Sequence, residues 1–349
     1  MIRSKMSNAR QLYDILRKDI VRGEYPMESK LPSIRTLAEK HGLCTNTVNT
    51  AIAMLVNEGI VTVRKGSGTY VTRAPRKSRM IGVLMFDFTS STRVDSAILE
   101  AIQRDLPPDY YFSLVNTNNS YDAFCESLGH LIDAGAVGLL IVPPVQLPNT
   151  ASELARIHTL LAQIPTVFIN RGISGIETDI YSMDLRRGME EALEYLYASG
   201  KRKTLVILHN SEKFANEQLA ACEDHRLRYG LPQEYIITLP MEGTIEELHR
   251  KVSSLLGQYD SFITSDNIIV QMTDIFAARD IRIPNQLSLV GINDTLLSRI
   301  HNPPLTSIAY PANQVGKNAV HRLIERIEGR YEGTGRLHNY KPEFIIRKT

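Results

Sequence analysis

A short basic turn rich in glycine lies near the amino terminus of this 349-residue sequence. Two β-prone runs, residues 60–63 and 69–71, flank it, which predicts a β-hairpin. The residues at or beside the turn are Arg64, Lys65, Gly66, Ser67 and Gly68. Arginine and lysine at a hairpin tip can contact phosphates or enter a minor groove, and glycine allows close backbone approach. The chemistry predicted for this tip is therefore nucleic-acid binding.

Three amphipathic segments precede the hairpin and must position it. Apolar residues recur in them at helical spacing: Leu12, Ile15, Leu16 and Ile20; Ile34, Leu37 and Ala38; and Val48, Ile52, Leu55 and Val56. Ser7, Ser33 and Thr45 are candidate N-caps, and Gly23 and Gly42 are typical helix ends. Two short helices joined by a glycine-containing turn are typical of a helix-turn-helix.

The charge of the chain is unevenly distributed. Residues 1–79 carry 15 Lys and Arg against 6 Asp and Glu, a net charge of +9. The remaining residues carry 25 against 32, a net charge of −7. This asymmetry indicates that only the amino-terminal part faces a polyanion. The segment 72–79 has four basic residues, one proline and no apolar period, and is either a solvated tether or an additional phosphate contact.

The rest of the composition excludes several classes of protein. The three cysteines are isolated and form no metal-ligand spacing, which suits a reducing compartment. No signal-peptide core and no apolar run near the roughly 20 residues of a membrane span are present. The sequence also lacks HExxH, GxSxG and complete phosphate-loop or dinucleotide motifs. We therefore expect a cytoplasmic protein that is not an enzyme, with no cofactor, metal site or membrane partner.

From residue 80 onward, short apolar runs alternate with helical stretches, and the rhythm restarts after residue 184. This pattern predicts an α/β fold with parallel sheets flanked by helices, divided into two subdomains. Such sheets bind ligands beyond the carboxyl ends of their strands, and paired subdomains bind them in the cleft between them.

The amino-terminal motifs resemble those of the GntR-type winged-helix regulators. The resemblance is carried by residues 30–38, 47–48, 58–61 and 65–71. It implies that Ser33 and Arg35 hold phosphates and that the tip 65–68 reaches the minor groove. It also implies that the start of the third helix enters the major groove, with Thr45, Asn46, Thr47 and Asn49.

The third helix departs from the family pattern. Many members carry arginines where this chain has Thr45 and Asn49. Arginine reads guanine, whereas asparagine can pair with the N6 and N7 atoms of adenine. Asn46 and Asn49 therefore predict more contact with A·T pairs than is usual in the family.

The remainder of the chain resembles the effector domain of LacI-type repressors, which is related to periplasmic binding proteins. The resemblance is carried by residues 135–143, 164–171, 265–267, 283–294 and 303–308. A GntR-type head on a LacI-type sensor is similar to the arabinose-repressor type of regulator. The implied organisation is a winged helix-turn-helix at 1–72, a basic linker at 73–79, and a ligand-sensing and dimerisation domain at 80–349.

The same resemblance implies nine effector-binding positions: Phe86, Asp87, Phe88, Asn170, Arg171, Glu190, Asp266, Asn293 and Tyr310. Polar planar groups of these types can bond paired hydroxyls, which favours a carbohydrate effector. Two departures, Asn293 in place of aspartate and Glu190 in place of arginine, leave a neutral or amine-bearing ligand as an alternative. Asn170 simply ending its strand and Tyr310 belonging to the core are alternatives for those residues.

Together these features predict a homodimeric, sequence-specific repressor of transcription that binds a pseudo-palindromic operator and responds to a small molecule. The alternative is a ligand-independent repressor or an activator that uses its C-terminal domain mainly for dimerisation.

Overall fold

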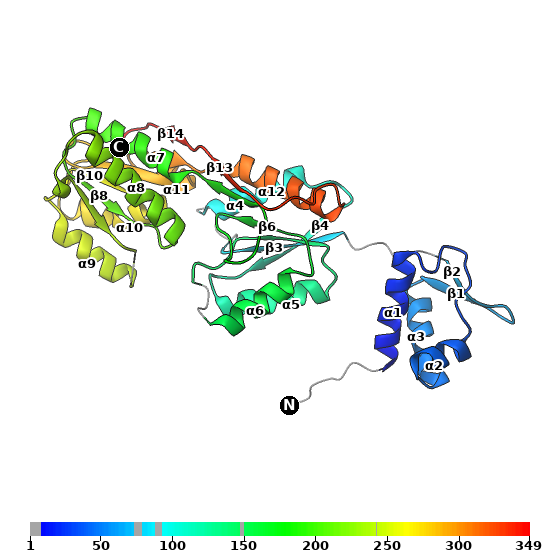
Figure 1. Cartoon of the computed structure of the whole chain (residues 1–349). Coiled ribbons are helices and arrows are strands. Elements are labelled where there is room, and N and C mark those ends of the chain that lie inside the picture. Colours follow the sequence, from blue (N-terminus) through cyan, green and yellow to red (C-terminus); the bar gives the residue numbers. More distant parts are fainter. Residues whose placement is uncertain (1–7, 73–78, 88–92, 147–149, 242) are drawn as a thin grey trace. The chain divides into compact units, whose positions relative to one another are not determined.

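The structure, a computed structural model, describes residues 8–72, 79–87, 93–146, 150–241 and 243–349. The chain divides into two compact units, Met1–Ser78 and Arg79–Thr349, each of which is described by itself (Figure 1).

Three helices and a two-stranded hairpin form the first unit: α1 (Asn8–Arg22), α2 (Ile34–His41), α3 (Thr45–Asn57), β1 (Val61–Arg64) and β2 (Gly68–Val71). Ser33 caps α2, because its hydroxyl accepts the Thr36 N–H at 3.1 Å, and Gly42 ends the helix with φ 64°. The predicted winged helix-turn-helix is therefore confirmed. The predicted cap Thr45 is wrong, because Cys44 holds the N-cap position and Thr45 is the first helical residue. The predicted cap Ser7 lies outside the described residues.

The core of this unit is formed by one face of each helix, with Leu12, Leu16, Leu37, Val48 and Leu55 fully buried. Three residues predicted to face inward do not: Ile15, Ile34 and Val56 are 42%, 37% and 38% exposed. In α1 the buried face also includes Ala9 and Tyr13, which places Ile15 roughly 110° from its centre at 100° per residue. The buried faces are thus narrower than the apolar stripes in the sequence.

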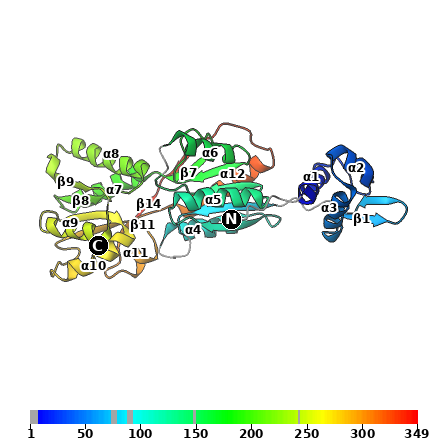
Figure 2. The same cartoon turned by 90° about the horizontal axis from the view of Figure 1, so that it is seen from below.

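The second unit contains two six-stranded sheets in separate lobes (Figures 1 and 2). The first has the order β13-β7-β6-β5-β3-β4 and is parallel throughout. Its strands are β3 (Met80–Met85), β4 (Tyr111–Asn116), β5 (Gly138–Ile141), β6 (Thr166–Ile169), β7 (Ile180–Met183) and β13 (Leu337–Tyr340). Its helices are α4 (Val94–Asp105), α5 (Tyr121–Asp133), α6 (Ala151–Leu161) and α12 (Ala312–Ile327).

The second sheet has the order β14-β12-β11-β10-β8-β9, with only β14 antiparallel. Its strands are β8 (Thr204–Ile207), β9 (Ile236–Leu239), β10 (Ser261–Ser265), β11 (Ser288–Asn293), β12 (Thr306–Ala309) and β14 (Glu343–Ile345). The helices that accompany it are α7 (Leu185–Ala198), α8 (Glu212–Arg228), α9 (Ile245–Leu255), α10 (Asp266–Ala277) and α11 (Leu296–Ile300), with the short helix η1 (Gln233–Tyr235). The predicted α/β class with two parallel-sheet subdomains is confirmed.

Within the described residues, the chain passes from one sheet to the other in three short crossings. Asp184 joins β7 to α7, residues 310–311 join β12 to α12, and residues 341–342 join β13 to β14. The first and third crossings are tied together by the Asp184 N–H, which donates to the Tyr340 carbonyl at 2.9 Å. At the second crossing, Tyr310 is buried.

None of the helices in the described part of the chain combines the length and apolarity that crossing a bilayer requires.

Candidate functional site

The start of α3 presents polar side chains at the surface of the first unit. Thr45, Asn46 and Asn49 are exposed, whereas Thr47 is half-buried and its hydroxyl lies 3.1 Å from the Cys44 sulfur. Val48 on the opposite face is fully buried and anchors the helix in the core. The exposed amides can therefore contact a partner without any rearrangement of the core.

The start of α2 offers one exposed cation. The Arg35 side chain is 88% exposed, and it pairs with Glu39 on the next turn, at 3.1 Å. An exposed pair of this kind contributes little to stability, so Arg35 can exchange Glu39 for a phosphate at small cost. The Ser33 hydroxyl already forms hydrogen bonds with the N–H and the hydroxyl of Thr36, so the main role of Ser33 in this structure is to cap α2.

The wing is held in shape by contacts between its own strands. The Arg64 guanidinium lies over the Tyr70 ring at 4.5 Å, and the Ser67 hydroxyl is 2.8 Å from the Tyr70 hydroxyl. Gly66 and Gly68 have φ values of 74° and 127°, which L-residues rarely adopt. The tip therefore presents Arg64 and the exposed Lys65 from a defined backbone.

Lys30 adds a cation that the sequence analysis did not assign to the site. A Cβ atom on Gly68 would lie 2.5 Å from the Lys30 Cε atom, so the lysine stem crosses the wing at the glycine. Lys30 also forms an antiparallel bridge with Tyr70. Lys30 opens the motif 30–38, but only the folded hairpin places it beside the wing.

A cavity of about 220 Å³ lies within the second unit, at the carboxyl ends of strands from both sheets. It is lined by Phe86, Arg93, Val94, Asp95, Val142, Val145, Asn170, Arg171, Met183, Leu185, His209, Asn210, Phe214, Met241, Ser265, Asp266, Asn267, Ile292, Asn293, Thr295 and Tyr310. We call it the effector pocket. Because Met183, Leu185 and Tyr310 flank or form the crossings between the sheets, a ligand here touches the joint between the lobes.

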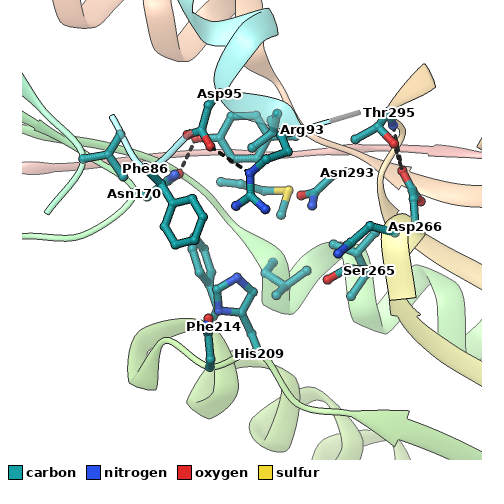
Figure 3. Close-up of a pocket in the computed structure, with 18 of the residues that line it drawn as sticks. Phe86, Arg93, Asp95, Asn170, His209, Phe214, Ser265, Asp266, Asn293 and Thr295 are labelled. Carbon is teal, nitrogen blue, oxygen red and sulfur yellow. Dashed lines mark hydrogen bonds and ion pairs between the residues drawn. The ribbon is translucent and has the colours of Figure 1, made fainter. Parts of the chain in front are cut away.

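One side of the pocket carries an arginine–aspartate pair (Figure 3). The Arg93 guanidinium lies 4.2 Å from the Phe86 ring centroid, and its Nε atom is 3.5 Å from the carboxylate of the buried Asp95. Burial raises the pKa of Asp95, and Arg93 opposes this shift. Burial also lowers the pKa of Arg171 to about 10, against the attraction of Asp95.

Asn170 and Tyr310 connect the two lobes across the pocket. The Tyr310 hydroxyl donates to Asn170 Oδ1, and the Ser182 hydroxyl donates to the Asn170 carbonyl at 3.0 Å. The side-chain oxygen of Asn170 is thus engaged, which leaves its amide NH₂ as the group available to a ligand.

His209 forms the floor of the pocket beside Phe214 (Figure 3), with the rings 5.1 Å apart. Burial, followed by the nearby cations Arg171, Arg93 and Lys213, lowers its pKa to about 4. The Ser211 N–H donates to Nδ1 at 2.8 Å, so the proton of the neutral ring is on Nε2. His209 is therefore a neutral hydrogen-bond donor at this surface.

Asp266 lies on the other side, with both carboxylate oxygens engaged by the chain itself. Thr295 donates its N–H and hydroxyl to Oδ2 at 2.7 and 3.0 Å, and the Ser307 hydroxyl donates to Oδ1 at 2.9 Å. Burial raises the pKa of Asp266 to about 6. A Cβ atom on Gly291 would collide with the carboxylate, so glycine is required beside it. Asp266 holds the loop that presents Asn293 and Thr295 to the cavity (Figure 3).

Two family models match separate parts of the chain. Residues 8–71 match the bacterial regulatory proteins of the gntR family, and residues 193–349 match the periplasmic binding protein-like domain. The chain therefore joins a GntR-type winged helix to a periplasmic-binding-protein-like domain. It is a DNA-binding transcription regulator.

Curated relatives match almost the whole chain. The arabinose metabolism transcriptional repressor of Halalkalibacterium halodurans is 25% identical, over 95% of this chain and 93% of that protein. The HTH-type transcriptional regulator KdgR of Bacillus subtilis is 23% identical, over 91% and 97%. A solved CelR–cellobiose complex has a TM-score of 0.67 at 16% identity, over 91% and 99%, and supports the fold.

The effector pocket gathers six of the nine predicted positions: Phe86, Asn170, Arg171, Asp266, Asn293 and Tyr310. Phe88 lies outside the described residues. Asp87 does not line the cavity, because its carboxylate turns to the Asn116 amide at 3.3 Å. Glu190 does not line it either, because it lies more than a turn along α7 and pairs with Arg186 at 3.4 Å.

The lining also includes polar side chains that the sequence did not predict, chiefly Arg93, Asp95, His209 and Thr295. Arg93 and Asp95 follow the first strand of the lobe by only a few residues, which is a usable signal. No local pattern marks His209, which reaches the cavity through the tertiary fold.

Proposed function

We propose that this chain is a homodimeric, ligand-gated repressor located in the cytoplasm, and that it has no enzymatic activity. Two winged helices, one from each subunit, read the two halves of a pseudo-palindromic operator. The DNA-binding residues are those at the start of α2 and α3 and at the wing tip. We assign residues 1–72 to the DNA-binding domain, 73–79 to the linker and 80–349 to the effector and dimerisation domain.

The observation that carries the gating proposal is the position of the effector pocket beside the crossings between the two sheets. A ligand bridging Asn170 in one lobe and Asn293 in the other favours the closed arrangement of the lobes. Only a ligand with unequal affinity for two arrangements can shift their populations, and the coupling with DNA is reciprocal. Arabinose metabolism in the name of one relative and cellobiose in one similar structure support a sugar-like effector.

Operator selection from a randomised DNA library, using the full chain, tests the DNA half of the proposal. The expected result is a two-fold symmetric site with A·T pairs opposite Asn46 and Asn49. Asn49→Ala relaxes base preference at one position in each half-site, whereas Thr50→Ala on the same helix is the matched control. A non-symmetric site contradicts the dimer, and an unchanged profile for Asn49→Ala contradicts the assigned reader.

Thermal-shift screening of sugars, polyols and amino acids, with and without operator DNA, tests the ligand half. The expected result is a stabilising compound whose affinity changes when DNA is present. Intact DNA binding with no stabilising compound favours a ligand-independent repressor or activator that uses the second unit for dimerisation.

A further inference from the structure

The effector pocket has more positive than negative charge where Arg93, Asp95 and Arg171 line it. Asp95 is the single acidic side chain on this side, and it lies beside both guanidinium groups. The second aspartate of the pocket, Asp266, lies beside Thr295 on the other side (Figure 3). Its two oxygens already accept three hydrogen bonds from the chain.

The two arginines are incompletely satisfied. Arg171 makes one long hydrogen bond, from Nε to the Pro144 carbonyl at 3.4 Å, and has no ion pair within 4.0 Å among the described residues. The Arg93 Nε atom is buried and makes no hydrogen bond in the described part of the chain, although the Asp95 carboxylate lies 3.5 Å away. Burying a guanidinium without full pairing is costly, so such a site is suited to an anion brought by a ligand.

The neighbouring polar groups are donors as well. His209 presents its Nε2–H, because Nδ1 accepts from Ser211. Asn170 presents its amide NH₂, because Oδ1 accepts from Tyr310. Three further side chains, Asn210, Asn267 and Asn293, can serve both as donors and as acceptors for hydroxyl groups.

From this arrangement we infer that the effector is a sugar acid: a small polyol whose carboxylate is bound by Arg171 and Arg93 and whose hydroxyls meet the asparagines. The one excess positive charge on the side of Arg93 and Arg171 matches a monoanionic carboxylate better than a dianionic phosphate. A cavity of about 220 Å³ is smaller than the roughly 300–1,000 Å³ of drug-sized sites, which favours a single sugar unit. Glu190, the acidic residue that favoured an amine-bearing ligand in the sequence, lies outside the pocket. This inference rests on the ligand-gated function proposed above.

The test is calorimetry on the full-length protein with matched probes: D-galactose and D-galacturonate, D-glucose and D-glucuronate, and L-arabinose and L-arabinonate. D-glucose 6-phosphate and D-ribose 5-phosphate form the phosphate arm. We expect at least one acid to bind roughly 10- to 150-fold more tightly than its neutral parent, as charge-assisted hydrogen bonds provide. Arg171→Gln abolishes that preference, and Arg250→Gln, at an exposed position of α9, preserves it.

A second measurement needs no ligand. Because the Arg171 side chain is partly buried and its guanidinium is under-paired in the free protein, Arg171→Met is expected to raise the melting temperature, and Arg250→Met to leave it unchanged. If Arg171→Met does not fold, the melting temperature of Arg93→Gln serves in its place. This readout applies even when no probe binds: no rise in melting temperature then contradicts the inference, and a rise supports it.

Other outcomes separate the two proposals. Neutral sugars that bind as tightly as their acids overturn the sugar-acid inference and leave ligand gating intact. Sugar phosphates that bind more tightly than the acids also overturn it, in favour of a phosphorylated effector. An acid that binds with the expected preference but leaves operator affinity unchanged upholds the inference and contradicts the gating.

Discussion

Replacing Lys65 with alanine removes one cation from the tip of each wing and disturbs little else, because this side chain is exposed at the turn. In a dimer, two phosphate contacts are lost. Each neutralised phosphate contributes about 0.9 to the slope of log affinity against log salt, so the slope becomes less steep by about 1.8. Over a fourfold increase in salt, from about 50 to about 200 mM, the loss of affinity then becomes about 12-fold smaller than in the wild type.

Fluorescence anisotropy with a labelled operator at several salt concentrations measures this slope directly. Lys251→Ala removes the same charge from α9 of the effector domain and serves as the matched control. A slope that is unchanged in Lys65→Ala, or that changes equally in Lys251→Ala, refutes a phosphate contact at the wing tip.

Three further predictions concern stability. Burial holds the pKa of Asp266 at about 6, above the value near 4 of an unfolded chain, so the native state loses stability as the pH rises from about 4 to 6. Asp266→Asn is expected to remove this pH dependence and to raise the unfolding free energy at pH 7.5 by up to about 3 kcal/mol in urea titrations. Asp179, fully buried against two arginines and a histidine, behaves oppositely. Asp179→Asn removes the buried carboxylate that pairs with Arg322 and Arg326 and is expected to lower the unfolding free energy by about 3–5 kcal/mol, and a loss below 1 kcal/mol contradicts this view. Gly68→Ala places a side chain at φ 127°, outside the left-handed helical region, and is expected to cost the winged helix about 1–3 kcal/mol. The end of the Lys30 side chain can move away from the new methyl group. Gly66→Ala has a φ of 74°, close to the left-handed helical region, and meets open space, so it is expected to cost less in the same chemical unfolding assay. The reverse order contradicts this backbone argument.

The winged helix could be predicted closely because its elements are bounded by local signals. Ser33 and Gly42 begin and end α2 through their own backbone and side-chain chemistry, and the turn glycines mark the wing. The buried face of each helix was predicted less well. The sequence shows where the apolar stripe of a helix lies but not how much of that stripe the neighbouring elements bury. For this reason Tyr13 is buried in the core, whereas Ile15 is exposed.

The effector domain shows the opposite balance. The alternation of strands and helices predicts its class, but β7, β13 and β14 are short strands of three or four residues whose pairing depends on distant segments. In the sequence, Asp95 in the first turn of α4 looks like an ordinary carboxylate at the start of a helix. Its role follows from Arg93 and Arg171, and Arg171 comes from a different part of the chain.

The three crossings between the lobes limit the kinds of motion available to the effector domain. Pro311 and Pro342 stiffen the second and third crossings. A backbone hydrogen bond from Asp184 links the first crossing to the third. Three crossings between the same two lobes can bend together but resist twisting and sliding of one lobe against the other. The lobes are therefore expected to open and close by a single hinge motion. Substitutions among the pocket side chains can therefore alter which molecule is bound, while the hinge motion that is coupled to DNA binding remains the same. Recognition and transmission can then evolve separately within one domain.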